Sequence, residues 1–522
     1  RKDPYFMQLS FDEIVTAVLG KEAFSISEER KKKIEETFEF LLSFSNDKVI
    51  YGINTGFGPM AQYKIAEDEL RNLQYNLVRS HASGMGDVLG VDQTRAMMIC
   101  RLNTLSMGRS GVSIGVINTL ERFINEEIYP EVYAHGGVGA SGDLVQLAHL
   151  ALGLIGEGYC QYQGQRRPVS EVLMEQGVQP LDLKLRDGLA LINGTSCMSG
   201  IGLLNIWRAK EVMHWSVKVS AMINELISSY DDSFSRELNE VKLHSGQQKV
   251  AALMRDFLSD SSMIKKREEH LFDMNGSAPD KFQEKVQEYY SLRCVPQIVG
   301  PIYDTIEQAE KVVVEEINSA NDNPITHMES NNVYHGGNFH GDYVAFEMDK
   351  LKIGMTKLTM LMERQLNYLL SARLNEKFPP FLNKGTLGLN FGLQGMQFAA
   401  TSTTAENQTL SNPMYVHSIS CNNDNQDIVS MGTNAAVITE KVIENATQVL
   451  AIEMIAAAQA IDISGCRDKL GSGSKKVFDD MCELAKGIDA DEPGYGKIQR
   501  VIDYLEKSMR ESIRIKQTKN EE

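Results

Sequence analysis

The sequence contains few cysteines, and none of them are paired. Its seven cysteines are scattered singly along 522 residues with no C-x-x-C spacing. An odd count without close pairs predicts neither a disulfide framework nor a zinc site, and it is typical of a reduced, cytoplasmic setting. The seven are Cys100, Cys160, Cys197, Cys294, Cys421, Cys466 and Cys482.

Positive charge and long apolar runs are also scarce. Lys and Arg number 53 against 70 Asp and Glu, which gives a formal net charge of −17. Nucleic-acid grooves need clustered basic residues, so this charge balance argues against a nucleic-acid partner. No apolar run approaches the ~20 residues of a membrane span. The stretch "RKDPYFMQLSFDE" has acids where a signal peptide would be apolar, so we expect neither a membrane partner nor a secretory leader.

Helical patterns are abundant, whereas strand patterns are short. Apolar residues recur every three or four positions from Met348 to Leu369, which predicts a long helix packed against other helices. The segment 442–461 is apolar nearly all round and predicts a helix buried in a bundle. Ser25 with Glu28 predicts a capping box at a helix start. "KVIYGI" (48–53) predicts a short strand.

These patterns predict a mainly α fold with three parts. Residues 1–200 form a mixed, loop-rich N-terminal domain, because short strand and helix signals alternate there with Gly-, Asn- and Ser-rich loops. Residues 201–465 form a central bundle of long helices. Residues 466–522 form a C-terminal helical extension and a charged tail.

The stretch "HGGVGASGDL" (135–144) contains glycines in the spacing G-x-G-x-x-G. In nucleotide-dependent oxidoreductases this spacing follows a buried strand and precedes, by about 20 residues, an acid for the ribose. Here Pro130 interrupts the preceding segment, the next notable acid, Glu157, comes too soon, and no βαβ units follow. The context therefore does not favour a nicotinamide cofactor.

The same stretch offers a different chemistry at Ala140, Ser141 and Gly142. In a tight turn the Gly142 nitrogen can reach the Ala140 carbonyl carbon, because glycine has no side chain to block the approach. Ring closure followed by loss of water, including the Ser141 hydroxyl, would leave an imidazolone with an exocyclic methylene. That group is an electrophile, which no ordinary side chain supplies. Ala-Ser-Gly alone is common by chance and could equally be a plain glycine turn.

The surrounding motifs decide between a plain glycine turn and a precursor of the imidazolone. The chain resembles the aromatic amino-acid ammonia-lyase family, whose members act on histidine, phenylalanine or tyrosine and include aminomutases. The resemblance extends over residues 10–465, with the motifs in the family's order. They are "YGINTGFG" (51–58), "NLVRSHASG" (76–84), "GGVGASGDLVQLAH" (136–149), "LINGTS" (191–196), "YYSLRCVPQ" (289–297), "NSANDNPI" (318–325), "GGNFHGD" (336–342) and "NQDIVSMG" (425–432).

The resemblance implies an ammonia-lyase-type helical fold and a homotetramer whose active sites each draw on three subunits. It also implies that Ala140, Ser141 and Gly142 form the methylidene-imidazolone group (MIO, 4-methylidene-imidazole-5-one), with no metal required. In this family the MIO takes up the substrate amine, a base removes the β-proton, and ammonia leaves. Tyr51 resembles the base, and that role requires a phenol pKa below its usual value of ~10.

Further roles follow from the resemblance. Arg293 resembles the clamp for the substrate carboxylate, which suits the planar, bidentate guanidinium. Tyr290 is expected to orient the substrate and stabilise negative charge, with Gln287 as a supporting polar group. The remaining expectations are that Asn193 hydrogen-bonds the imidazolone, Asn323 the carboxylate, and that Phe339 forms a wall beside the imidazolone. Outside these motifs, each residue would be interpreted as an ordinary structural Arg, Tyr, Asn or Phe.

Two positions in the family's pattern concern the substrate ring. Ser80-His81 occupies the ring-selecting pair, where a histidine can hydrogen-bond a phenol or an imidazole but a phenylalanine lyase carries apolar residues. At Asn425-Gln426, histidine lyases carry an acid where this chain has the neutral Gln426, and a carboxylate would favour an imidazole over a phenol. The combination predicts L-tyrosine as substrate and trans-p-coumarate as product, that is, a tyrosine ammonia-lyase.

Alternatives remain open on the sequence. Ser80-His81 also suits a histidine ammonia-lyase, which would form urocanate. A tyrosine 2,3-aminomutase would share the same residues and return the amine to the β-carbon. A nucleotide-dependent oxidoreductase and a purely structural helical bundle are the alternatives from other classes.

Overall fold

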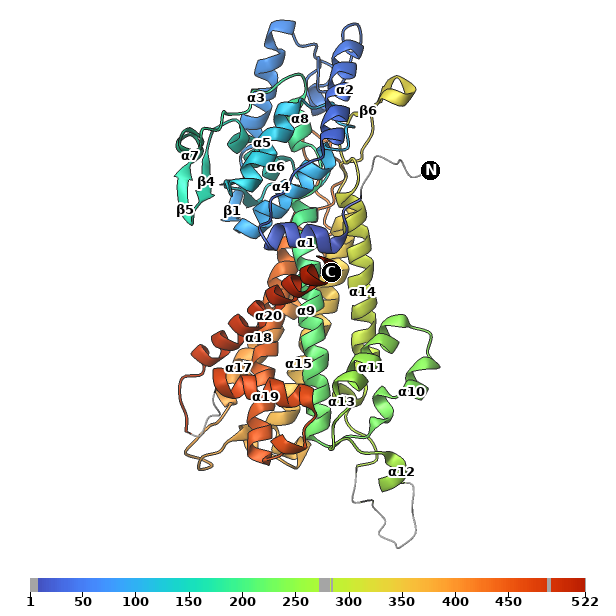
Figure 1. Ribbon diagram of the computed structural model, residues 1–522, viewed down its shortest axis with the longest axis vertical. Helices are drawn as coiled ribbons and strands as arrows, with labels where there is room; N and C mark the ends of the chain where they lie inside the picture. Colours follow the sequence, from blue (N-terminus) through green and yellow to red (C-terminus); the bar gives the residue numbers. More distant parts are fainter. Residues whose placement is uncertain (1–7, 272–281, 283–284, 486–489, 522) are drawn as a thin grey trace.

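Long helices make up the centre of the molecule. The computed structural model describes residues 8–271, 282, 285–485 and 490–521 (Figure 1). The central helix α15 packs against α18, α9, α14 and α17, and α18 in turn packs against α9 and α17. This confirms the prediction of a mainly α fold. The five helices are α9 (Ser196–Leu226), α14 (Val295–Ile317), α15 (Asp342–Leu370), α17 (Gln394–Leu410) and α18 (Gly432–Ser464).

The two helices with the clearest sequence patterns are both core helices. In α15 the apolar positions that recur every three or four residues from Met348 to Leu369 are buried, as the periodicity predicts. In α18 nearly every residue of 442–461 is buried. Within the described part of the chain, α18 alone is long and apolar enough to cross a membrane, but most of its apolar window lies inside the bundle. Its hydrophobicity is therefore that of a core helix.

The N-terminal elements cover one end of the bundle, at the top of Figure 1. They are α1 (Phe11–Leu19), α2 (Glu28–Phe44), α3 (Leu70–His81), α4 (Val91–Leu105), α5 (Ile114–Asn125), α6 (Leu144–Leu154), α7 (Val169–Gln176) and α8 (Asp187–Ile192). Three small antiparallel sheets accompany the helices: β1 (Met85–Val88) with β3 (Tyr133–His135), β2 (Tyr129–Pro130) with β4 (Tyr159–Tyr162) and β5 (Gln165–Pro168), and β6 (Ile325–His327) with β7 (Asn332–Tyr334).

Strand β3 leads towards the glycine loop, but it does not belong to a nucleotide-binding sheet. It pairs only with β1, in antiparallel orientation, and among the described strands none pair in parallel within a sheet. Pro130 lies in β2, which is an edge strand, where a proline costs no ladder hydrogen bond. The glycine loop therefore has no parallel sheet behind it, which is the context that a dinucleotide turn requires.

Two local predictions in this region are wrong. Residues 48–53 form a turn, because the Asn54 side chain bonds the Lys48 carbonyl at 2.7 Å and the Ile50 N–H at 3.0 Å, the groups that a strand partner would need. Helix α2 begins at Glu28, and its cap is Ser27, whose hydroxyl accepts from the Arg30 N–H. The Ile26 N–H bonds Glu121 instead, so the chain is still extended where Ser25 would start a helix.

The remaining helices lie around the bundle. The segment containing α10 (Arg236–Glu240), α11 (Ser245–Phe257), α12 (Arg267–His270) and α13 (Tyr290–Arg293) occupies the end opposite the N-terminal elements (Figure 1). Helix α16 (Ala372–Asn375) follows α15. Helices α19 (Ser472–Leu484) and α20 (Tyr495–Glu521) pack against α18, and α20 also contacts α1. The division at residues 200 and 465 stays a prediction.

Candidate active site

The Ala140-Ser141-Gly142 tripeptide lies in a turn that only glycine can complete. Gly142 has a φ of +70°, and a Cβ added there would overlap the Gly194 carbonyl. The Gly139 N–H donates to the Gly142 carbonyl at 3.2 Å, and the Asp143 N–H donates to the Gly194 carbonyl at 2.8 Å. The chain thus folds back on itself over three residues while pressed against the segment before α9. This tight, closely packed turn fits the cyclisation that the sequence predicts.

Asp143 anchors the turn to the core. Its carboxylate is fully buried and accepts a hydrogen bond from the Met198 N–H at 2.9 Å, in the first turn of α9, and another from the Thr433 hydroxyl of α18. Burial raises the pKa of this carboxyl to about 6, although these hydrogen bonds oppose the shift. The tripeptide is therefore attached to two long bundle helices. Asp143 was not predicted as a site residue, and its only signal in the sequence is its position directly after Gly142.

A cavity of about 550 Å³ opens beside Ser141 and brings together most of the predicted site. The predicted residues that line it are Tyr51, Ser80, His81, Ser141, Asn193, Asn323, Phe339, Asn425 and Gln426. Ten further residues line the cavity that were not predicted from the sequence: Phe57, Gly58, Met60, Ala61, Leu73, Asn76, Leu77, Leu144, Leu189 and Asn422. Leu73, Asn76 and Leu77 stand one or two turns before Ser80 and His81 on α3, so helical spacing could have identified them.

Tyr51 is held at both ends. Its hydroxyl accepts a hydrogen bond from the Gly58 N–H at 3.0 Å, and its own N–H donates to His335 Nε2 at 3.3 Å. Burial raises the pKa of the Tyr51 phenol, while the Gly58 N–H and the charge of Arg186 act in the opposite direction. In the isolated chain the pKa therefore moves upward, which is opposite to the shift expected for a base. The physical reason is that desolvation outweighs the two favourable groups.

His81 ends helix α3 with a defined orientation. Its Nδ1 lies 3.0 Å from the Leu77 carbonyl oxygen and 3.1 Å from Ser80 Oγ. Because a carbonyl oxygen only accepts, we assign the hydrogen to Nδ1, which leaves Nε2 as an acceptor. His81 therefore offers the cavity a hydrogen-bond acceptor.

Gln426 is in direct contact with the tripeptide. Its Nε2 donates to Ser141 Oγ at 3.2 Å. Gln426 also exchanges backbone hydrogen bonds with Cys421, and this closes a loop in which Asn422, Asn423 and Asp424 all have positive φ. Asn and Asp tolerate that backbone region better than most residues. The loop presents a neutral amide to the reacting serine.

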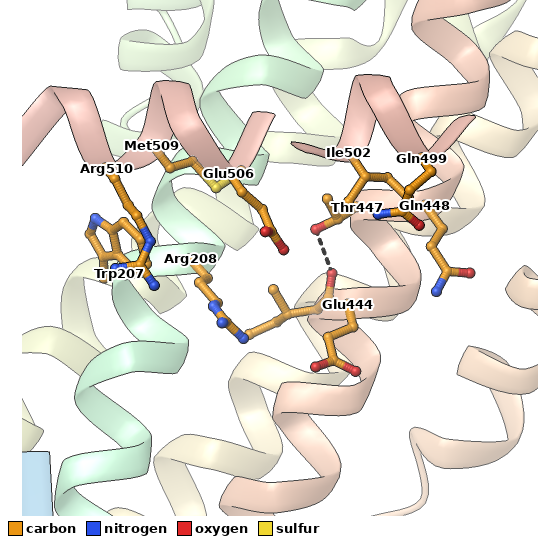
Figure 2. Close-up of a pocket in the computed structure, with 11 residues that line it drawn as sticks. Trp207, Arg208, Glu444, Thr447, Gln448, Gln499, Ile502, Glu506, Met509 and Arg510 are labelled. Atoms are coloured by element: carbon orange, nitrogen blue, oxygen red, sulfur yellow. Dashed lines mark hydrogen bonds between the residues drawn. The ribbon is translucent and has the colours of Figure 1, made fainter. Parts of the chain in front are cut away.

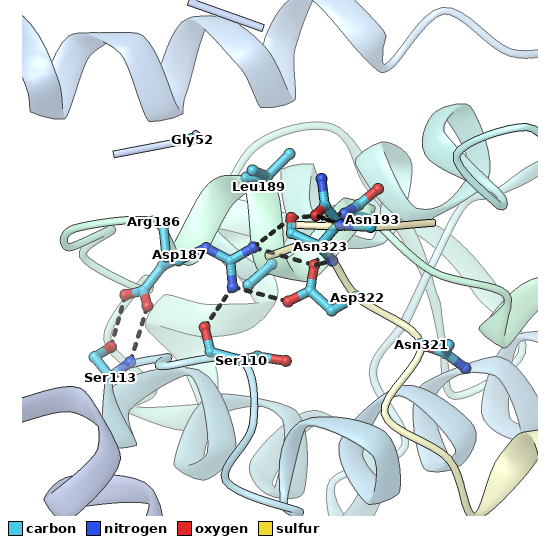
Figure 3. A network of polar contacts seen from close by, with 12 residues as sticks. Gly52, Ser110, Ser113, Arg186, Asp187, Leu189, Asn193, Asn321, Asp322 and Asn323 are labelled. Carbon is cyan, nitrogen blue, oxygen red and sulfur yellow. Dashed lines mark hydrogen bonds and ion pairs between the residues drawn. The ribbon is translucent and has the colours of Figure 1, made fainter. Parts of the chain in front are cut away.

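A buried polar network supports the other side of the cavity (Figure 3). Arg186 and Asp322, both fully buried, form a bidentate ion pair with N–O distances of 2.9 and 3.1 Å. Asp322 accepts from Asn193 Nδ2 at 2.9 Å, and the Asn323 carbonyl accepts from both Asn193 and Arg186. The Ser110 carbonyl accepts a further hydrogen bond from the Arg186 guanidinium. This network joins α8 to the 321–323 loop and fixes both asparagines.

Three predicted residues lie elsewhere. Tyr290 is 70% exposed on α13, and Arg293 stacks on its ring while donating to the Glu288 carbonyl at 2.6 Å. Gln287 and Arg293 line a separate cavity of about 290 Å³. Helix α9 links the two regions, since Met198 bonds Asp143 and Asn224 bonds the Leu292 carbonyl. Those 26 residues of helix correspond to roughly 40 Å. Within one chain, Arg293 therefore cannot reach Ser141.

Within the described residues, neither a metal site nor the cavity between α9, α18 and α20 competes with this assignment. Among the described residues, no group of three or more His, Cys, Asp and Glu side chains could hold a metal ion. A cavity of about 230 Å³ lies between α9, α18 and α20 (Figure 2) and has Trp207, Arg208, Glu444, Glu506 and Arg510 among its lining residues. None of the predicted site residues lines it.

Comparison with known proteins agrees with this geometry. A family model described as "Aromatic amino acid lyase" matches residues 9–483. A histidine ammonia-lyase of Staphylococcus aureus is 37% identical over 483 residues, covering 92% of each chain. A MIO-dependent tyrosine 2,3-aminomutase of Streptomyces globisporus is 38% identical over 482 residues, covering 91% of this chain and 89% of that one. The crystal structure of tyrosine aminomutase from Streptomyces globisporus superposes with a TM-score of 0.93 at 35% identity, covering 97% of both chains.

Proposed function

This chain belongs to the aromatic amino acid lyase family, and we propose that within it the protein is a tyrosine ammonia-lyase that converts L-tyrosine to trans-p-coumarate and ammonia. The family uses a MIO group formed from Ala-Ser-Gly. The observation that carries the choice of tyrosine is the placement of the His81 acceptor nitrogen and the neutral Gln426 around the same cavity as Ser141.

The residues present fit the MIO group. Ala140, Ser141 and Gly142 would hold it, because Gly142 has the backbone conformation and the closeness to Gly194 that exclude any side chain. When formed, the group supplies an electrophile for the substrate amine. The Gln426 amide and the Asp143 anchor keep the tripeptide in place without introducing a carboxylate into the cavity itself.

Ring recognition follows from hydrogen-bond polarity. A tyrosine phenol can donate its O–H to the free Nε2 of His81, since Nδ1–H is already used by the Leu77 carbonyl. A phenylalanine ring would cover that half-buried acceptor without offering it a partner, which costs about 1–3 kcal/mol. Gln426 adds no negative charge that would favour an imidazolium. A neutral phenol ring is therefore the ring that these two residues recognise best.

Proton transfer is the role we propose for Tyr51. Its phenolate would remove the β-proton of the substrate, and the Gly58 N–H and Arg186 both stabilise that negative charge. Phe339 and Leu189 provide apolar walls that keep the ring in position. The Asn323 amide would bind the substrate carboxylate, as the family resemblance implies.

The substrate carboxylate also needs a cation, and the chain that holds Ser141 does not supply Arg293 there. We propose that Arg293, Tyr290 and Gln287 of neighbouring subunits complete each cavity in a homotetramer. The exposure of Tyr290 on the bundle end supports this proposal. A cavity whose amides are in place but which lacks a carboxylate clamp is what a shared site would look like in a single chain.

Two other family activities have specific support. The Staphylococcus aureus relative is named a histidine ammonia-lyase, and the free acceptor of His81 could also take an imidazole N–H. The Streptomyces globisporus relative is named a tyrosine 2,3-aminomutase. Its product differs only in where the amine ends, so the residues that bind a tyrosine ring do not distinguish it from a lyase.

One parallel assay separates these activities. The purified full-length protein is incubated with tyrosine, phenylalanine and histidine, and the absorbance of p-coumarate, cinnamate and urocanate is followed, with amino-acid analysis for β-tyrosine. We expect p-coumarate to dominate. Intact mass should show a deficit of two waters, and Ser141→Ala should restore the unmodified mass and remove the activity. An active Ser141→Ala protein, or urocanate as the main product, would refute the proposal.

A further inference from the structure

Asn193 and Asn323, which line the cavity beside Ser141, differ in which side-chain amide atom already forms hydrogen bonds within the protein. Asn193 uses its Nδ2 for two hydrogen bonds, at 2.9 Å to Asp322 Oδ1 and at 3.1 Å to the Asn323 carbonyl. Asn323 uses its Oδ1 to accept from the Gly336 N–H at 2.8 Å. Both side chains line the same cavity.

These partners determine the amide orientations without ambiguity. The Asp322 carboxylate, paired with Arg186, and the Asn323 carbonyl are acceptors only, so the Asn193 atom that faces them must be the NH₂ group. The Gly336 N–H is a donor only, so the Asn323 atom that faces it must be the oxygen. Flipping the Asn193 amide would place its oxygen against other acceptors, and flipping the Asn323 amide would place its NH₂ group against the Gly336 N–H donor.

The uncommitted atoms are therefore of opposite kinds. Both hydrogens of Asn193 Nδ2 are taken, and among the described residues none donates to its Oδ1. The Oδ1 atom is left as an acceptor. Within the same described part of the chain, Asn323 Nδ2 has no acceptor and is left as a donor. Figure 3 shows the two side chains next to each other above Asp322.

We propose that Asn193 binds the amino group of the substrate through Oδ1, with the Arg186–Asp322 ion pair as the positioning device that enforces this polarity. This inference rests on the proposed function, in which the cavity binds an aromatic amino acid. An imidazolone ring has a carbonyl oxygen and two nitrogens without hydrogens, so it only accepts and cannot pair with Oδ1. The amino group of the substrate carries N–H donors, so it can form a hydrogen bond with Asn193 Oδ1. Asn323 Nδ2 is then the partner for the carboxylate.

The test compares two ligands that each carry one half of the substrate. Tyramine has the amino group without the carboxylate, and 3-(4-hydroxyphenyl)propionate has the carboxylate without the amino group. Binding is measured by calorimetry on the full-length protein with Ser141→Ala, so that no covalent adduct forms. Asn193→Leu and Asn323→Leu are matched variants, because both replace an amide with an apolar group of similar shape.

Asn193→Leu should weaken tyramine binding about 10- to 100-fold and leave the propionate within about twofold. Asn323→Leu should do the reverse. If Asn193→Leu weakens the propionate as much as tyramine, the proposal is wrong. Where Asn193→Leu does not fold, Asn193→Ala removes the same oxygen without adding bulk beside Asp322. If neither phenolic ligand binds but histamine and 3-(imidazolyl)propionate do, tyrosine is not the substrate. The two asparagine variants are then compared with these two imidazole ligands, and that comparison still decides whether Asn193 binds the amino group.

Discussion

The cavity around Ser141 and the α13 segment around Arg293 contrast sharply, although the sequence marks both with equally clear motifs. Around Ser141, the polar side chains are held in place by partners within the chain: Tyr51 is bonded at both ends and Gln426 reaches Ser141 itself. At α13, Tyr290 is mostly exposed, and among the described residues Arg293 donates to the Glu288 carbonyl and stacks on the Tyr290 ring. Roughly 40 Å of helix α9 separates them. This contrast is the basis of our proposal that the two regions are halves of a site that meet between subunits.

The strongest test of this contrast is complementation between variants. Tyr51→Phe and Arg293→Met should each reduce kcat/KM by about 10²- to 10⁴-fold, through loss of the base or of the carboxylate clamp. Co-expressed with different affinity tags and purified through both, the mixed oligomers should regain a measurable fraction of activity, because some cavities receive both intact residues. The measurement is kcat/KM per mixed oligomer against each parent.

The matched control pairs two defects from the same region. Tyr51→Phe mixed with Ser141→Ala should regain nothing, since Tyr51 and Ser141 line one cavity of one chain. Recovery in this control, or its absence in the first mixture, would show that the two regions are not divided between subunits as proposed.

A second prediction concerns the selectivity of the cavity half alone. His81→Phe removes the Nε2 acceptor and should shift the ratio of kcat/KM for tyrosine over phenylalanine by about 10- to 100-fold towards phenylalanine. The measurement is the pair of specificity constants. Ser80→Ala serves as the control, because it leaves the bond of His81 to the Leu77 carbonyl in place. A ratio unchanged by His81→Phe would remove His81 as the selector.

A third prediction follows from the pKa of Tyr51. Only the phenolate is a base, and burial raises the pKa of this phenol, so kcat/KM should climb by up to about tenfold per pH unit through neutral pH and continue above about pH 8. The residual activity of Tyr51→Phe should lack this rise. A wild-type profile that is already flat at pH 7 would mean that groups from the α13 half lower the pKa in the assembled protein.

The smallest effect is expected at Gln426. Gln426→Glu places a carboxylate against Ser141 and should reduce turnover of tyrosine by roughly tenfold while admitting histidine, whose imidazolium the new charge favours. Gln426→Met, which is similar in size and uncharged, should reduce tyrosine turnover without admitting histidine. If both variants behave alike, charge is not what separates tyrosine from histidine in this cavity.

The fold was predictable where a pattern repeats over several turns. The periodicity of 348–369 and the apolar run of 442–461 identified α15 and α18, because burial of one face or of all faces leaves a periodic record. Short elements were not predictable in this way. The strand expected at 48–53 is a turn held by Asn54, and α2 starts two residues later than the Ser25 capping box would place it. In each case hydrogen bonds from side chains to the backbone override the local preference.

For the site, the motifs identified the lining residues but not their supports. Nothing in the sequence singled out Asp143, Arg186 or Asp322, although these buried charges hold the tripeptide and the two asparagines. Their partners lie up to 290 residues away along the chain. Such pairings leave no mark in local periodicity, since they depend only on which segments the fold brings together.

By itself, the sequence determined that this is a helical member of the aromatic amino acid lyases with an Ala-Ser-Gly tripeptide, because motif chemistry and helix periodicity are local properties. Only the tertiary structure decided that Ser141, His81, Gln426 and the two asparagines share one cavity while Arg293 does not. It also decided which amide atom each asparagine presents. The physical reason is that a hydrogen bond has a direction, and that direction is set by partners that are distant in sequence and adjacent only after folding.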